Sequence, residues 1–327
     1  SEGLMELREG VANYLQGMGL EATKEDIIIV SGAQQTLSLC SQAFLDEENA
    51  VAVEAPSYVG GLNAFKTSQA SIYEVAMKEN GIDLLALEAC FKTYSPSLFY
   101  AIPNFQNPSG ITYDKQTREG VAKLLEKYNV VLLEDDPYRE LRYSGEAITP
   151  ISAYAPKRSV YTGSFSKILM PGIRLGWIYA KEEIFEKLLI LKQSNDLHSN
   201  AFLQQVLIDY FKDNDFNAHL EVLREIYSNR LNIMIDSLQT MMPKEITYHV
   251  PKGGMFVWLT IPNSIDVHEL LEKCIQEKVI FIPGDVFYAS DGAKSSLRLS
   301  FATSSEADIK KGVKALAKVL IKFINFH

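Results

Sequence analysis

The 327-residue chain has few cysteines and histidines, and it lacks long apolar runs and an excess of positive charge. Its three cysteines, Cys40, Cys90 and Cys274, are far apart, which argues against a disulfide framework and predicts a reducing compartment, the cytoplasm. The five histidines show no paired spacing, so the sequence offers no metal site. No apolar run approaches the roughly 18–20 residues of a membrane span. The net charge of −9 disfavours nucleic-acid binding, which requires a basic face.

The residues that are present alternate between short apolar runs and amphipathic segments. The hydrophobic fraction of 47% and the charged fraction of 22% are typical of a soluble globular protein. Buried strands are predicted at 27–32, 50–56, 97–104, 129–137, 159–164 and 172–180, and helices at 33–45 and 115–128. This alternation predicts an α/β fold with a mostly parallel sheet.

The pattern changes at about residue 181, where long amphipathic helices begin and continue through 214–242. After Pro243, short predicted strands such as "GGMFVWLTI" and "SLRLSF" are mixed with helices. We therefore expect two domains. The larger covers residues 11–226, and the smaller α+β domain covers residues 227–327.

Polar and aromatic residues follow five successive predicted strands. They are Ser31 to Gln35, Tyr58, the turn 106–110, Asp135 with Asp136 and Tyr138, and Ser164, Ser166 and Lys167. Ligands of open α/β sheets bind beyond the carboxyl ends of the strands. The small residues at 31–33 precede a predicted helix, whose N-terminal N–H groups suit a phosphate.

Taken singly, each of these features has an ordinary structural explanation. The turn Asn107-Pro108-Ser109-Gly110 is a strong turn signal by itself, Asp135 and Asp136 could simply end a strand, and Lys167 could extend to the surface. Their appearance in order at consecutive strand ends is the signal that favours a binding site.

The same segments carry a family resemblance. The motifs "SGAQQ", "EAPSY", "PNFQNPSG", "EDDPY", "GSFSKILMPGIRLGW" and "LRLSFA" run from residue 31 to residue 302. With them the chain resembles the fold-type I, pyridoxal-phosphate (PLP)-dependent aminotransferases of class I/II, in the branch with 2-aminoadipate, kynurenine and aromatic aminotransferases. The resemblance implies a mostly parallel seven-stranded sheet with helices on both faces and a smaller α+β C-terminal domain.

The resemblance also implies roles for residues around the cofactor ring. Lys167 would form a Schiff base with PLP and shuttle the proton, and Asp135, rather than its neighbour in the sequence, would pair with the pyridine nitrogen. Asn107, which is expected to precede a cis proline bond, and Tyr138 would hydrogen-bond the phenolic oxygen. Tyr58 would stack on the ring.

At the cofactor phosphate, the resemblance implies binding by Ser164, Ser166 and Arg174 together with Ala33 and Gln34. Arg298, with Asn107, would bind the substrate, and the arginine would clamp the α-carboxylate through a two-pronged ion pair. The catalytic residues implied in this way are Lys167, Asp135 and Tyr138.

The implied reaction moves an amino group from an L-amino acid to a 2-oxo acid, with 2-oxoglutarate as acceptor, by a ping-pong mechanism. The implied assembly is a homodimer with its active site near the subunit boundary. Family members usually carry several dozen residues before the motif that opens this chain, so residues 1–10 are expected to be the remnant of an N-terminal segment. No nucleic-acid or membrane partner is expected.

Two alternatives share the cofactor motifs. The first is another fold-type I PLP enzyme, such as a β-lyase or a cyclopropane-forming synthase, which would keep Lys167, Asp135 and Arg298. The second is the aminotransferase-like sensor domain of a GntR-type transcription regulator. The stretch "EDDPYREL" favours the free-standing enzymes.

Overall fold

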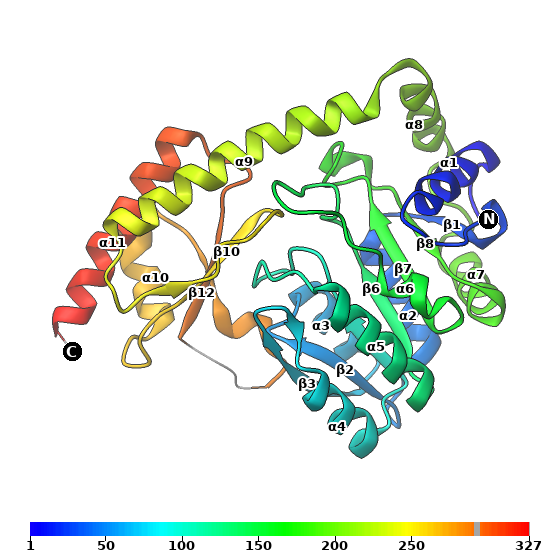
Figure 1. Ribbon diagram of the computed structural model, residues 1–327, viewed down its shortest axis with the longest axis horizontal. Helices are drawn as coiled ribbons and strands as arrows, with labels where there is room; N and C mark the ends of the chain where they lie inside the picture. The colour runs from blue at the N-terminus through cyan, green and yellow to red at the C-terminus, as the bar shows by residue number, and fades with distance from the viewer. Residues whose placement is uncertain (291–294, 327) are drawn as a thin grey trace.

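The computed structural model describes residues 1–290 and 295–326, which fold around two β-sheets (Figure 1). In this part of the chain the large sheet has eight strands in the order β1-β8-β7-β6-β5-β2-β3-β4. Their bounds are β1 Ile27–Val30, β2 Ala50–Ala55, β3 Ser71–Lys78, β4 Gly81–Ile82, β5 Leu98–Ala101, β6 Val131–Asp135, β7 Ser159–Ser164 and β8 Gly176–Tyr179. Strands β3, β2, β5, β6 and β7 run parallel, whereas β8, β1 and β4 pair antiparallel. The mostly parallel sheet is therefore confirmed.

The observed sheet differs from the sequence-based prediction by two strands, β3 and β4, which lie at one end of the strand order. Strand β3 was not among the predicted strands, because most of its residues are only partly buried or exposed, so it lacks the continuous apolar run of a central strand. The two-residue strand β4 pairs with β3 and raises the number of strands from the seven expected to the eight found in the described residues.

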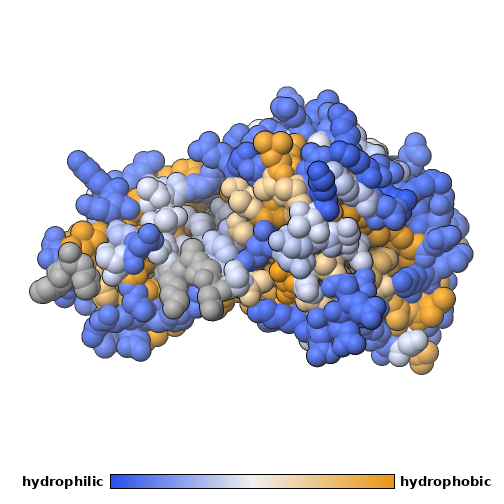
Figure 2. Space-filling view, turned by 90° about the horizontal axis from the view of Figure 1, so that it is seen from below, coloured by the Kyte–Doolittle hydropathy of each residue, from blue (hydrophilic) through white to orange (hydrophobic). Residues whose placement is uncertain are grey.

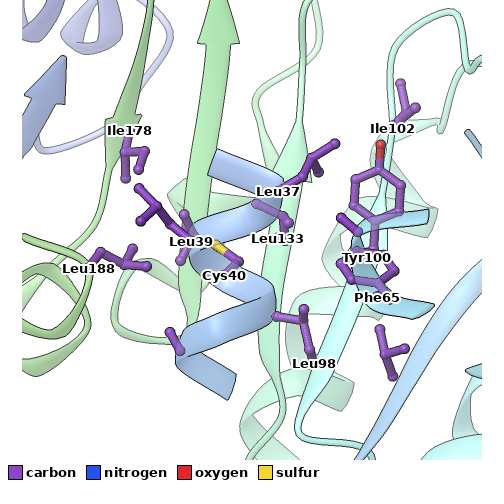
Figure 3. Packing of buried hydrophobic residues seen from close by; sticks show 14 of the residues in the cluster. Leu37, Leu39, Cys40, Phe65, Leu98, Tyr100, Ile102, Leu133, Ile178 and Leu188 are labelled. Atoms are coloured by element: carbon purple, nitrogen blue, oxygen red, sulfur yellow. The ribbon is translucent and has the colours of Figure 1, made fainter. Parts of the chain in front are cut away.

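Helices cover both faces of the large sheet. They are α1 Met5–Gln16, α2 Ala33–Phe44, α3 Val59–Thr67, α4 Leu84–Tyr94, α5 Lys115–Tyr128, α6 Ile151–Tyr154, α7 Glu182–Asp196 and α8 Ala201–Asp213. Alternate strand residues point to opposite faces. Leu133 of β6 packs in the cluster with α2, as Figure 3 shows, whereas the preceding Leu132 packs in the cluster with α4 and α5. Both faces are thus apolar and buried.

The small sheet is antiparallel, in the order β11-β12-β10-β9. Its strands are β9 Thr247–Tyr248, β10 Phe256–Thr260, β11 Ile282–Pro283 and β12 Ser296–Ser300, and its helices are α10 Val267–Gln276 and α11 Glu306–Phe326. Helix α9, Phe216–Met241, is shared: Leu220 packs with the large-sheet side, and Leu231 packs with the small sheet. The domain boundary expected between residues 226 and 227 falls inside this helix.

Polar side chains cover much of the face seen in Figure 2, with apolar side chains gathered near the middle, where the molecule narrows. Among the helices in the described ranges, none is long and apolar enough to cross a membrane.

Candidate active site

A cavity of about 430 Å³ lies between the carboxyl ends of the large-sheet strands and the small sheet. All eleven residues that the sequence singled out line it: Ala33, Gln34, Tyr58, Asn107, Asp135, Tyr138, Ser164, Ser166, Lys167, Arg174 and Arg298. The lining also includes Leu37, Ile102, Pro137 and Phe256, which the sequence analysis missed. Ile102 lies inside a predicted strand and Pro137 inside a quoted motif, but apolar residues carry no chemical signal of their own. The structure therefore brings the whole predicted set together.

Asp135 ends β6 and is buried on the cavity side. The Tyr100 hydroxyl donates a hydrogen bond to its Oδ2 at 2.9 Å, while its Oδ1 has no hydrogen-bond partner among the described residues. Burial raises the pKa of Asp135 to about 7, and the Tyr100 hydrogen bond and the Lys167 charge oppose that rise. An open acceptor on a buried carboxylate suits a ligand that brings a proton donor.

Asp136 lies outside the cavity lining, and both of its carboxylate oxygens accept hydrogen bonds. The Asn104 Nδ2 donates to both of its oxygens at 2.9 Å, and the Tyr161 hydroxyl donates to Oδ2 at 3.0 Å. The Arg139 guanidinium lies 3.8 Å from the same Oδ2. This side of β6 is a closed structural network, as the alternation of side chains along a strand requires.

Lys167 follows β7 and is partly buried in the cavity wall. Burial lowers the pKa of its amine, and the positive charges of Arg174 and Arg298 lower it further, whereas Asp135 raises it. A lowered pKa increases the neutral fraction of the amine, which is the form that acts as a nucleophile or base.

An anion cradle forms where β1 meets α2 and where β7 turns towards Arg174. Helix α2 begins at Ala33 without a side-chain cap in the described structure, so its first N–H groups are available to an anion. The Arg174 Nη1 donates to the Ser166 Oγ at 3.2 Å. Gly32 has φ +82°, a backbone conformation that favours glycine, and a Cβ there would lie 2.8 Å from the Arg174 Nη2.

Arg298 reaches the cavity from β12 of the small sheet. Its Nη1 donates to the Asn107 Oδ1 at 2.6 Å, and its guanidinium lies 4.0 Å from the centre of the Phe256 ring. Its Nε has no hydrogen-bond partner among residues 1–290 and 295–326. The Asn107–Pro108 bond is cis, as expected, and Gln106 holds the turn by donating to the Glu54 Oε2 at 2.9 Å.

These groups fit PLP by their chemistry. The open Oδ1 of Asp135 can accept a hydrogen bond from a protonated ring nitrogen, and the cradle at α2, Ser166 and Arg174 can bind a phosphate. The Tyr58 ring and the Lys167 amine line the space between them.

Comparison with known proteins agrees with this chemistry. The model of the family "Aminotransferase class I and II" matches residues 1–316. Aromatic-amino-acid aminotransferase 1 of Thermococcus litoralis is 36% identical over 98% of this chain and 78% of its own length.

Of two further matches, one is an aminotransferase and the other is a transcription regulator. The crystal structure of LysN, the α-aminoadipate aminotransferase of Thermus thermophilus, complexed with N-(5'-phosphopyridoxyl)-L-leucine, has a TM-score of 0.95 at 35% identity, covering 100% of this chain and 84% of that one. The HTH-type transcriptional regulator YdfD of Bacillus subtilis is 31% identical over 98% of this chain but only 66% of the regulator. The chain thus belongs to the class I and II aminotransferase family and is a PLP-dependent enzyme.

Proposed function

We propose that this enzyme moves an amino group from an L-amino acid to 2-oxoglutarate in a ping-pong reaction, with Lys167 as the Schiff-base lysine. The observation that carries the proposal is that Lys167, Asp135 and Arg298 line one cavity although they come from different elements. Together they offer an amine, an open carboxylate acceptor and an arginine clamp.

The cofactor, when bound, supplies an electron sink for the carbanion left when the substrate Cα loses its proton. Lys167 takes that proton, since its lowered pKa leaves more of the amine neutral at neutral pH. Asp135 would hold the ring nitrogen in its protonated state through the open Oδ1. Tyr138 and Asn107, which line the cavity, would hydrogen-bond the phenolic oxygen of the cofactor.

Arg298 binds the substrate α-carboxylate and thereby orients the Cα–H bond towards Lys167. The Asn107 side chain and the Phe256 ring hold its guanidinium in one place before substrate arrives. A planar guanidinium that is oriented in advance loses less conformational freedom when it binds a carboxylate through two hydrogen bonds.

The lysine assignment is tested by borohydride reduction of the enzyme with PLP, followed by peptide mapping. We expect the pyridoxyl group on Lys167. A label on a different lysine would contradict the assignment.

The reaction is tested with a panel of amino acids and 2-oxoglutarate, with aromatic, 2-aminoadipate and branched-chain donors included. We expect a 2-oxo acid and pyridoxamine phosphate as products. Ammonia and pyruvate would instead identify a β-lyase, and cofactor binding without turnover of any donor would favour a sensor domain of the kind found in transcription regulators.

We also infer a cytoplasmic homodimer with shared active sites. Large apolar side chains are exposed on α7, on α8 and between them, among them Leu197 at 64% directly after α7 and Phe202 at 75% on α8, and such surfaces are typical of protein interfaces. Sedimentation with and without PLP tests the dimer. A stable monomer of about 37 kDa with full activity would rule out a shared site.

The free, buried cysteines Cys40, Cys90 and Cys274 support a reducing compartment. For the domains, we propose residues 11–226 and 227–327, joined through α9. The change of packing partners between Leu220 and Leu231 along α9 supports a boundary in this helix.

A further inference from the structure

Tyr100 on β5 contacts the proposed cofactor acid although it does not line the cavity. It pairs with Leu133 of β6 in the parallel sheet, and Asp135 lies two residues further along β6 on the same face. Diagonal neighbours at this offset are within reach of an aromatic side chain. The Tyr100 hydroxyl donates to the Asp135 Oδ2 at 2.9 Å.

The Tyr100 ring is held on two sides. The Phe65 ring packs edge-on against it with 5.4 Å between centroids, and Figure 3 shows the two rings beside each other. Gly61 of α3 lies so close that a Cβ there would be 2.7 Å from the Tyr100 Cε1. The ring is also fully buried, so the hydroxyl has little freedom to leave Asp135.

We propose that Tyr100 is a positioning residue that orients the Asp135 carboxylate, occupying Oδ2 so that Oδ1 is presented to the pyridine nitrogen of the cofactor. The inference rests on the proposed pairing of Asp135 with that nitrogen. The two carboxylate oxygens differ in their partners. Oδ2 accepts the hydrogen bond from Tyr100, and Oδ1 has no partner among the described residues.

The phenol also favours the charged form of the acid. Burial raises the pKa of Asp135, and a hydrogen bond donated to the carboxylate lowers it. The other titratable groups that act on Asp135 or respond to its charge are Lys167, Asp136, Glu54, Tyr58, Tyr138 and Cys40. Of these, Lys167 favours the carboxylate and Asp136 disfavours it, so loss of the Tyr100 hydroxyl removes one of the two groups that favour its charge.

The chain offers a matched control in Tyr161 of β7. It pairs with Glu134, and its hydroxyl donates at 3.0 Å to the Oδ2 of Asp136, which is two residues further along the chain and directly follows β6. Tyr161 is as deeply buried as Tyr100 and makes the same type of bond at the same strand offset. The difference is that its partner lies on the closed face of the sheet.

The experiment compares Tyr100→Phe with Tyr161→Phe in the holoenzyme. The ¹⁵N NMR signal of ring-labelled PLP reports the protonation state of the pyridine nitrogen, and the dissociation constant of PLP and steady-state kinetics are measured alongside it. For Tyr100→Phe we expect the nitrogen signal to move towards unprotonated pyridine, about tenfold weaker PLP binding, and a lower kcat with KM for the amino donor little changed. Tyr161→Phe should retain the wild-type signal and PLP affinity.

A wild-type nitrogen signal and PLP affinity in Tyr100→Phe would overturn the inference, as would equal changes in both variants, which would indicate a general loss of packing. Asp135→Asn separates this result from failure of the proposed function. If Asp135→Asn moves the nitrogen signal and Tyr100→Phe does not, the positioning role alone is wrong. If Asp135→Asn also leaves the signal unchanged, the pairing itself is wrong, and the role of Tyr100 falls with it.

Discussion

Asp135 and Asp136 are adjacent in the sequence and almost equally buried, at 3% and 4% exposure, but they face opposite sides of the large sheet. The Asp136 carboxylate has its polar contacts within the protein, with Asn104, Tyr161 and Arg139. Asp135 keeps one oxygen without a partner in the described residues. Buried polar groups are nearly always hydrogen-bonded, so the open oxygen supports the proposal that this face receives a ligand.

Two arginines repeat the contrast. Arg142 lies 4.7 Å from the centre of the Phe105 ring and donates to the Asn104 Oδ1 at 3.1 Å. Arg298 likewise lies over an aromatic ring and donates to an asparagine oxygen, but its buried Nε has no partner within the described ranges, and it lines the cavity. Similar local contacts therefore surround a structural arginine, Arg142, and the arginine for which we propose substrate binding, Arg298.

The largest expected effect comes from removing the negative charge of Asp135, whose Oδ1 is open to the cavity. Asp135→Asn should lower kcat by about 10²- to 10³-fold, because the cofactor nitrogen loses the negative charge that keeps it protonated. The cofactor should remain bound through the phosphate cradle. Single-turnover kinetics of Cα proton abstraction, with PLP content measured in parallel, check this result.

Removing the negative charge of Asp136, whose oxygens are both hydrogen-bonded, should lower stability instead of activity. In Asp136→Asn, one amide oxygen replaces two carboxylate oxygens, and the new NH₂ faces the Asn104 Nδ2 donor, so buried donors lose their acceptor. We expect a loss of about 3 kcal/mol in the free energy of unfolding, with kcat of the folded enzyme nearly preserved. Denaturant titration measures the loss. If this variant has a lower kcat than Asp135→Asn, the two acids have been assigned to the wrong faces.

Arg298 and Arg142 extend the comparison to substrate binding. Arg298→Lys should raise KM for the amino donor by about 10- to 100-fold, since an ammonium cannot form the two parallel hydrogen bonds to a carboxylate. Arg142→Lys is the matched control, and it should cost about 1 kcal/mol of stability while leaving KM unchanged. Steady-state kinetics and thermal unfolding of both variants test the pair. Equal KM values in the two variants would contradict the assignment of Arg298.

The smallest expected effect is a pH dependence of cofactor affinity. The pKa of Asp135 is raised to about 7 by burial, so the carboxylate that binds a protonated ring nitrogen is lost as the pH falls through that value. PLP affinity should therefore weaken towards acid pH, by at most about tenfold per pH unit. Titrations of wild type and Asp135→Asn between pH 6 and 8 isolate this contribution, because titration of the phosphate is common to both. Parallel curves would exclude Asp135 as the titrating group.

Eleven of the residues that line the cavity could be named from the sequence because each follows a buried strand or lies in a quoted motif, and neighbouring parallel strands bring their carboxyl ends to one edge. The sequence did not predict the role of Tyr100, because that depends on the register that sets Tyr100 opposite Leu133. Phe256 was missed for a related reason. Its place in the cavity depends on how the small sheet meets the large one, and that packing leaves no local pattern in the chain.

The residues of the proposed active site come from both sides of the molecule, which helix α9 connects. Lys167 follows β7 of the large sheet and Arg298 lies on β12 of the small one, and α9 packs against both sides. With 26 residues, α9 is about 39 Å long at a rise of about 1.5 Å per residue. A tilt of about 5° at its Leu220 end would displace its far end by roughly 3 Å, as far as one hydrogen bond is long. Substitutions in α9 that change this tilt should thus alter substrate binding without contacting the substrate.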